Sequence, residues 1–475
     1  MENLSAPDII NSQPKQSSLV TVFSIWNTMM GTSLLSLPWG IQQAGPIPAF
    51  FILILMASLT FYTAYLVLKS PKLLPPGTFI NEFTDVCERK LGKWAKYLGL
   101  IFTLIAFFGA MLIYWVLMSN FLTFTGYLAQ DVVKGNLSEY VLFQPEVVCH
   151  EKSNASLSSI NSIKNVWNPT TVPIFLAVLV FPLLFVDDVV FFTKFNALGT
   201  ISVLNLLVMA MIKMVLWKGV NITQEELFYY SPIGAFKFSG MLSLALLIHN
   251  AIITIMRNNY NQENNTRDLA IGYGLTSGTY LVVGMLFFLG IPFSKKCIAD
   301  NILNNFLTND LMIAIARIFL LFQMSTVFPL LAYLFRTNLM SVFYPETVEF
   351  TENDDEALAV LPEIEESFSV IDPTIESDDD EAPLIRTPGG LAKPDRKQFV
   401  QYMINITILF CCIITAVFFP NIGKLIGLAG SLCGAVFIFF LPFAVHWKTS
   451  SVVKRVCYAA CMIFGLTNLV FQLYV

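Results

Sequence analysis

The stretch WNTMMGTSLLSLPWG, Trp26 to Gly40, lies inside an apolar segment long enough to cross a lipid bilayer. The middle of this stretch carries small and polar residues, namely Asn27, Thr28, Gly31, Thr32 and Ser33. In hydrocarbon an unpaired backbone group is costly, so a helix opens there only where protein, water or a ligand takes over its hydrogen bonds. We therefore predict that the helix is interrupted near Gly31 and that a ligand binds at the interruption. The alternative is that these small residues only let helices pack closely.

The composition places this interruption in a membrane protein. Of 475 residues, 55% are hydrophobic and 13% are charged, and a soluble domain could not bury so much apolar surface. Windows of roughly twenty apolar residues span ~30 Å of hydrocarbon and here predict an all-α polytopic fold with eleven transmembrane helices. The windows are 19–43, 46–69, 95–129, 171–187, 194–217, 236–257, 269–292, 308–337, 399–419, 423–446 and 452–474.

Lys and Arg residues predict the orientation of these helices. They gather in the loops at 69–96, 257–267 and 448–455, which places these loops and the N-terminus in the cytosol and the C-terminus in the lumen. The chain then divides into a short cytosolic tail (1–18), helices one to eight (19–344) with a lumenal loop (130–168), a cytosolic loop (345–398) and helices nine to eleven (399–474). Within the lumenal loop, Asn136 and Asn154 each begin a sequon for N-glycosylation.

The loop at 345–398 is strongly acidic. Residues 345–390 include fifteen Asp or Glu and one Arg, with too few large apolar residues to form a core, so we expect the loop to be disordered. It contains the run DDDEAPLIR, in which Asp380 precedes Leu384 and Ile385. This is the acidic dileucine pattern that clathrin adaptors read when they sort membrane proteins to endosomes and lysosomes. The alternative interpretation is a solvated acidic linker.

Two of the eight cysteines, Cys149 and Cys297, fall in loops predicted to face away from the cytosol. Thiols in an oxidising compartment tend to pair, so we predict a disulfide between them, with two free thiols as the alternative.

A second interruption is expected in the matching helix of an inverted repeat, with helices one to five and six to ten as the halves. Helix six reads FSGMLSLALLIHN, and its Ser239, Gly240 and Ser243 end suits a break. His249 could line the site or respond to protons, although an ordinary interhelical hydrogen bond is an equal alternative.

Helix eight, RIFLLFQMSTVFPLL, places polar residues in an apolar run. The hydroxyls of Ser325 and Thr326, together with Thr32, would complete an oxygen cage for Na⁺. Alternatively, these hydroxyls bond back to the preceding turn of their own helix. The run LAYLFR at 331–336 fits the loose pattern for cholesterol contact. Catalytic and nucleotide-binding motifs are absent, so we expect no enzyme activity, no organic cofactor and no nucleic-acid partner.

Several of these motifs together resemble the sodium-coupled neutral amino acid transporter family, in the amino acid/auxin permease branch of the amino acid–polyamine–organocation superfamily. They are WNTMMGTSLLSLPWGIQQAG, YWVLMSNF, FFTKFNALGTISVL, IHNAIITIMRNNYNQENNTRDL, ARIFLLFQMSTVFPLL and FPNIG. The resemblance covers about residues 19–344 and 399–474. It implies the LeuT-type 5+5 inverted repeat, with eleven helices of which the first and sixth are broken.

The resemblance also implies a function and a site. It implies proton- or sodium-dependent movement of leucine, arginine or glutamine across the lysosomal or late endosomal membrane, under regulation by arginine. The alternative is a sensor with weak transport that reports arginine to growth signalling. The segment Asn27 to Leu35 matches the family's arginine site, with Thr32 the strongest correspondence, and the family supports the cysteine pairing. The expected substrate-binding residues are Asn27, Thr28, Met29, Met30, Gly31, Thr32, Ser33, Ser243 and His249.

The termini and loops depart from the family pattern. A family member engages the Rag GTPase–Ragulator assembly through a long N-terminal tail, whereas about eighteen residues precede the first predicted helix here. Docking of that assembly through the tail is therefore not expected. The acidic insert at 345–386 has no counterpart in the resemblance.

Overall fold

The computed structural model describes residues 16–75, 78, 80, 82–149, 166–185, 199–343 and 396–473. These residues form helices and isolated bridge pairs, with no strand among them. Three sets of predictions lie outside the described residues. They are the sequon at Asn154, the sorting motif with Asp380, Leu384 and Ile385, and most of the segments 1–18 and 345–398.

Every predicted apolar window contains a helix. Within the described residues, eight helices are long and apolar enough to cross a membrane. They are α4 (Pro46–Lys69), α6 (Lys93–Val133), α9 (Gly199–Leu216), α13 (Asn265–Gly290), α14 (Leu311–Phe343), α16 (Arg396–Phe418), α17 (Ile422–Phe437) continued by α18 (Leu441–His446), and α19 (Val452–Leu473). A ninth span is the bent pair α2 (Ser18–Met29) and α3 (Ser33–Ala44).

The two remaining windows hold shorter helices. One contains α7 (Val172–Val180) and the 3-10 turn η4 (Phe181–Phe185), and the other contains α11 (Pro232–Ala245) and α12 (Ile252–Arg257). Short helices α5 (Phe83–Leu91) and α10 (Gln224–Leu227) lie in connecting segments. A polytopic, all-helical membrane fold is thus confirmed for the described residues, whereas the count of eleven spans and the inverted repeat stay predictions.

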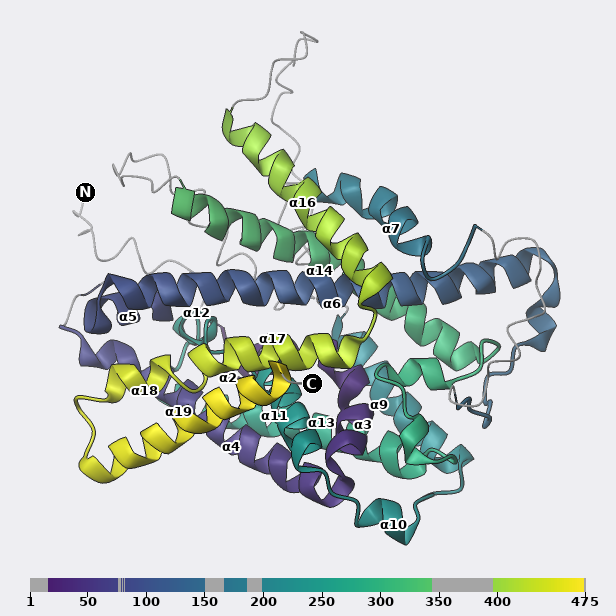
Figure 1. The fold of residues 1–475 in the computed structure, drawn as a ribbon, viewed down its shortest axis with the longest axis horizontal. Coiled ribbons are helices and arrows are strands. Elements are labelled where there is room, and N and C mark those ends of the chain that lie inside the picture. The colour runs from purple at the N-terminus through teal and green to yellow at the C-terminus, as the bar shows by residue number, and fades with distance from the viewer. Residues whose placement is uncertain are drawn as a thin grey trace, which may run out of the picture.

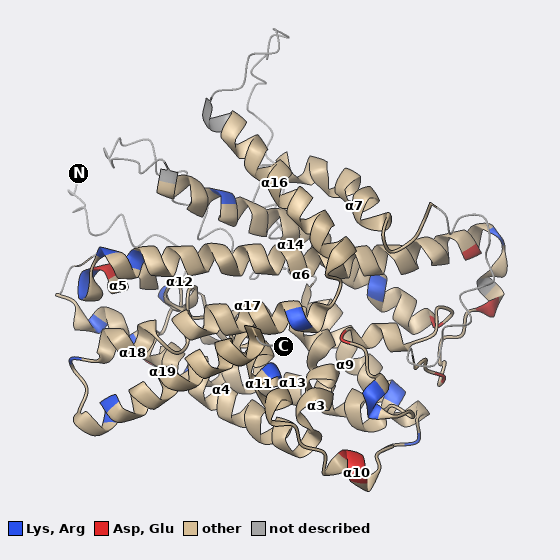
Figure 2. Ribbon diagram, in the orientation of Figure 1, with Lys and Arg blue, Asp and Glu red and all other residues tan. Residues whose placement is uncertain are grey.

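Helices α6 and α17 run in nearly the same direction, and α16 crosses them steeply (Figure 1). Helix α6 has 41 residues, about 60 Å at 1.5 Å per residue, or twice the ~30 Å hydrocarbon core. It runs along the long axis of the molecule, beside α17 below it and α14 behind it (Figure 1). Many Lys, Arg, Asp and Glu residues lie toward the two ends of this axis, near α5 and α18 at one end and near the far end of α6 and beyond α9 at the other, and a few lie between them near α10, α11 and α17 (Figure 2). The apolar middle between them is the part that a bilayer would cover.

Small residues bring α11 and α17 into close contact, and this corrects the predicted position of the second break. A Cβ added at Gly430 would lie 2.1 Å from the carbonyl oxygen of Gly240, and one at Gly434 would lie 2.8 Å from the Cβ of Ser243. The Ser239 to Ser243 stretch is therefore helical and packs on α17. The break comes later, at 246–251, where α11 has ended and α12 has not begun.

Candidate binding site at the broken helix

The break in the first span lies where the sequence predicts it. The two helices meet at 61°, and Met30 between them has an extended backbone with φ −72° and ψ 100°. Helix α3 restarts with Leu34 N–H donating to the Gly31 carbonyl at 3.2 Å. The N–H groups of Thr32 and Ser33 have no acceptor among the described residues. The predicted interruption near Gly31 is confirmed.

A small pocket adjoins this break, with a cavity volume of about 20 Å³ inside about 350 Å³ of empty space that includes open solvent. Its wall on the first span consists of Met30, Gly31, Thr32, Leu34 and Leu35. The opposite walls come from three other helices, with Tyr114 from α6, Val203 and Leu206 from α9, and Leu320, Gln323 and Met324 from α14. A Cβ added at Gly31 would meet nothing within 4 Å, so the backbone there borders open space. The pocket is mostly apolar and has polar backbone groups on one side.

Tyr280 of α13 holds the two broken helices together. Its buried hydroxyl donates to the carbonyl of Met29 at the end of α2, and it lies 3.0 Å from the carbonyl of Ala245 at the end of α11. Carbonyls at a helix end have no hydrogen-bond donor in their own helix. Here the hydroxyl of Tyr280 lies within hydrogen-bond distance of one such carbonyl from each broken helix. Sequence reasoning missed this residue, because a tyrosine in an apolar span gives no signal of its partners.

The predicted substrate-binding residues of the first span separate into two groups. Met30, Gly31 and Thr32 line the pocket, and Ser33 is buried beside them. Asn27 and Thr28 do not line the pocket. The Asn27 side-chain oxygen accepts from the Thr200 hydroxyl at 3.3 Å, and the Thr28 hydroxyl donates to its own helix. Met29 contributes its carbonyl to Tyr280 instead.

Ser243 and His249 lie away from the pocket. The Ser243 hydroxyl donates to the carbonyl of Ser239 at 2.9 Å, within α11. His249 is in the second break and fully buried, and its Nε2 lies 2.8 Å from the hydroxyl of Thr63 on α4. For His249 the structure shows the interhelical hydrogen bond that the sequence left open as an alternative.

The predicted Na⁺ ligands on α14 bond within their own helix. Ser325 donates to the carbonyl of Leu321 and Thr326 to that of Gln323, each at 2.7 Å. Neither lines the pocket. No cluster of His, Cys, Asp or Glu suited to a metal occurs in the described residues. Sodium binding therefore stays a prediction.

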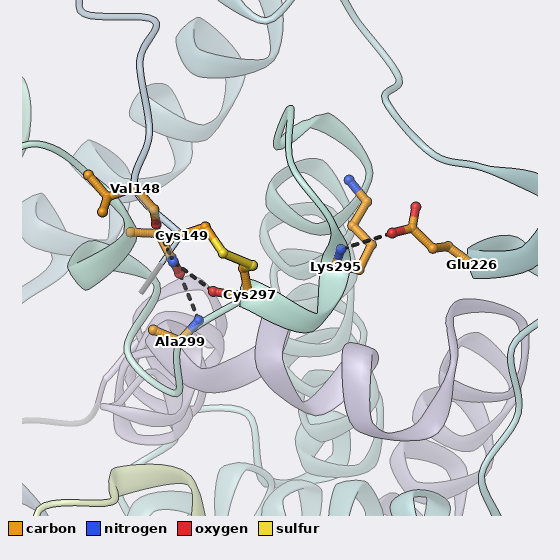
Figure 3. The surroundings of a disulfide bond; sticks show 7 residues. Val148, Cys149, Glu226, Lys295, Cys297 and Ala299 are labelled. Carbon is orange, nitrogen blue, oxygen red and sulfur yellow. Dashed lines mark hydrogen bonds between the residues drawn. A yellow bond between two sulfur atoms is a disulfide. The ribbon is translucent and has the colours of Figure 1, made fainter. Parts of the chain in front are cut away.

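One end of the molecule carries the predicted disulfide. Cys149 and Cys297 are bonded, with their Cα atoms 5.1 Å apart. Figure 3 shows the disulfide with Val148 and Ala299 beside it. The buried Asn305 supports the bond, because its side-chain nitrogen donates to the carbonyls of Val148 and Cys297 at 3.0 and 2.9 Å. Asn136, the described sequon residue, is exposed on this end.

The segment after the disulfide contacts the start of α17. The carboxylate of Asp300 accepts from the N–H groups of Ile422 and Gly423, at 2.6 and 3.3 Å. Burial raises the pKa of Asp300 above its ordinary value, and the backbone N–H donors oppose the rise. The contact joins the loop after α13 to the start of α17.

Fold and pocket together define a class of protein. Secondary transporters bind solutes at broken helices near mid-membrane, where freed backbone groups meet the ligand, and this chain has that arrangement. It belongs to the family described as transmembrane amino acid transporter protein, whose model matches residues 14–475. The family resemblance seen in the sequence motifs is confirmed.

Individual relatives cover most of the chain. It is 38% identical over 467 residues to Neutral amino acid transporter 9 of Danio rerio, covering 92% of this chain and 76% of the relative. It is 34% identical over 499 residues to Sodium-coupled neutral amino acid transporter 9 homolog of Caenorhabditis elegans, covering 96% and 73%. Vacuolar amino acid transporter 2 of Saccharomyces cerevisiae is 21% identical over 345 residues, covering 71% and 64%. The crystal structure of MhsT in complex with L-phenylalanine gives a TM-score of 0.48 at 9% identity, covering 98% of this chain and 99% of that one.

Proposed function

We propose that this chain moves amino acids across a membrane by alternating access and binds them at the break between α2 and α3. The observation that carries the proposal is the pair of N–H groups at Thr32 and Ser33, which begin a helix beside the pocket and have no acceptor in the described residues. Free N–H groups and the positive end of a helix favour an anion. They therefore suit the carboxylate of an amino acid.

The pocket walls favour an uncharged substrate. No residue that lines the pocket is charged, and a buried charge needs a partner. Leucine and glutamine therefore fit this pocket better than an amino acid with a positively charged side chain would. Relatives of this chain are named neutral amino acid transporters. In this proposal arginine acts on the same broken helix as a regulator of transport.

Sodium couples to transport in this proposal through Thr32, Ser325 and Thr326. The two hydroxyls on α14 donate to their own helix, which leaves their oxygen lone pairs available to a cation. A relative carries the name sodium-coupled. Uptake that is equal with and without a Na⁺ gradient would remove sodium from the mechanism.

We further propose a lysosomal or late endosomal location, with the N-terminus cytosolic. The support is the acidic dileucine pattern at Asp380, Leu384 and Ile385, and a relative named as vacuolar. Replacing both Leu384 and Ile385 with Ala should move the protein to the plasma membrane, as seen by surface biotinylation. A protein that stays on lysosomes would show that another signal sorts it.

The site is tested with Thr32→Trp in proteoliposomes. The indole would fill the pocket beside the break, so uptake and binding of labelled leucine should both be lost. The matched control is Thr407→Trp on α16, where the side chain is exposed and uptake should persist. Uptake by Thr32→Trp at the wild-type rate would remove the first span from the site. Wild-type protein that binds amino acids without flux would instead support the sensor function.

A further inference from the structure

A single carboxamide side chain lines the pocket. Gln323 lies on α14 between two apolar lining residues, Leu320 and Met324. Its side-chain amide has no hydrogen-bond partner among the described residues, although its backbone carbonyl accepts from Thr326. A glutamine that served only to join helices would bond across to one of them. Gln323 lines the pocket and makes no such bond within the part of the chain that the structure describes.

The neighbouring helix leaves room for this side chain. A Cβ added at Gly199, the first described residue of α9, would lie 2.3 Å from the Nε2 of Gln323 and 2.9 Å from its Cδ. Any residue other than glycine at position 199 would therefore place its Cβ where the amide of Gln323 now lies. The amide rests against the start of α9, on a different wall from the break in the first span.

The rest of the pocket offers little polar contact. Leu34, Leu35, Val203 and Leu206 are apolar, and the polar side chains besides Gln323 are those of Thr32 and Tyr114. Thr32 is at the break, where the backbone N–H groups lie. A substrate whose carboxylate occupies the break would direct its side chain into the apolar part, and Gln323 is the carboxamide available to it there.

We propose that Gln323 is a specificity-determining residue that selects amino acids with an uncharged, hydrogen-bonding side chain, above all a carboxamide. A carboxamide both donates and accepts, so two of them can pair reciprocally. An aliphatic side chain leaves the amide unpaired when water is displaced, and a charged one meets no opposite charge. The inference rests on the proposed function, because it assigns a substrate class to the same pocket.

The test is a competition in which proteoliposomes take up labelled glutamine and leucine that are supplied outside at equal concentration. The ratio of the two uptakes does not depend on how much protein is active. Gln323→Met keeps the length of the side chain and removes the amide, so the ratio of glutamine to leucine should fall about 2- to 10-fold, the range for one hydrogen bond. The control is Ile318→Met on a different face of the same helix, where 42% of the side chain is exposed, and its ratio should match that of the wild type.

Two further variants keep the outcome decisive. Gly199→Ala should lower the ratio in the same direction, because the new methyl group displaces the amide. Gln323→Glu should lower it and raise uptake of lysine, because the pocket then holds a negative charge. An unchanged ratio in Gln323→Met, or in Gln323→Glu where the first variant does not fold, overturns the inference while leaving the transporter intact. Wild-type protein that takes up neither amino acid refutes the proposed function instead.

Discussion

The substitution Tyr280→Phe tests whether one hydroxyl holds the two breaks in a binding-competent arrangement. This hydroxyl donates to the carbonyl of Met29 and lies 3.0 Å from that of Ala245, and all three residues are buried. Phenylalanine keeps the ring and its packing and removes only the oxygen. The change therefore leaves helix-end carbonyls without a donor where water does not readily reach.

The expected size follows from the cost of an unpaired buried group. A hydroxyl has one proton, so we count one carbonyl, at about 1–3 kcal/mol. If that cost falls on the arrangement that binds substrate, affinity for leucine or glutamine should weaken about 5- to 150-fold. A lower midpoint of thermal unfolding should accompany the weaker binding.

Binding of labelled leucine to purified protein gives the measurement. The matched control is Tyr62→Phe, which removes a hydroxyl 3.2 Å from that of Tyr458 on α19, whereas the carbonyls of Met29 and Ala245 bond to Tyr280. The control should bind as the wild type does. Equal affinity in Tyr280→Phe and wild type would refute the idea that Tyr280 sets the geometry of the site.

Three other substitutions test the ends of the molecule. Burial raises the pKa of Asp300, so protonation favours the folded loop, and this stabilisation is lost as pH rises through the raised value. Asp300→Asn should therefore flatten the pH dependence of proteolysis at this loop on the alkaline side of the ordinary aspartate pKa. Cys149→Ser should speed proteolysis of the same loop, and reductant should do so only in the wild type. Lys213→Met leaves the buried carboxylate of Asp310 without its ion-pair partner, so it should lower stability by about 3–5 kcal/mol, and a double variant with Asp310→Asn should recover much of the loss.

The first break was predictable because the bilayer makes helix breaks expensive. An uninterrupted membrane helix disfavours residues such as Asn27, Gly31 and Thr32 in its middle, so their presence there predicts a break. The disulfide was predictable for a similar reason, since topology alone left two cysteines on one side. Both arguments depend on the membrane, which limits what each residue can do.

The second break was misplaced because small residues serve two purposes. Gly240 and Ser243 permit close contact with α17, whereas the break at 246–251 lies in the run LLIHNA, which has no Gly or Pro. Gln323 is one of the polar residues that the sequence places in an apolar span. The position of its amide, however, depends on Gly199 in another helix, which the sequence does not show to be a neighbour. Val203 and Leu206 gave no signal, because a pocket wall and a lipid-facing surface use the same residues.

The proposed alternating access requires that contacts on the two sides of the binding site open in turn, and the segments before and after α13 each contact another helix. At one end, the N–H of Gln16 donates to the Asn258 carbonyl at 2.7 Å and the N–H of Tyr260 to the Gln16 carbonyl at 2.8 Å, which ties the start of α2 to the segment before α13. At the other end, the segment after α13 reaches α17 through Asp300. Between them Tyr280 holds both breaks. A shift of α2 away from α13 would therefore strain the contact of Tyr280 with Met29 at the first break. In the proposed function this contact would couple opening at one end of α13 to the geometry of the binding site.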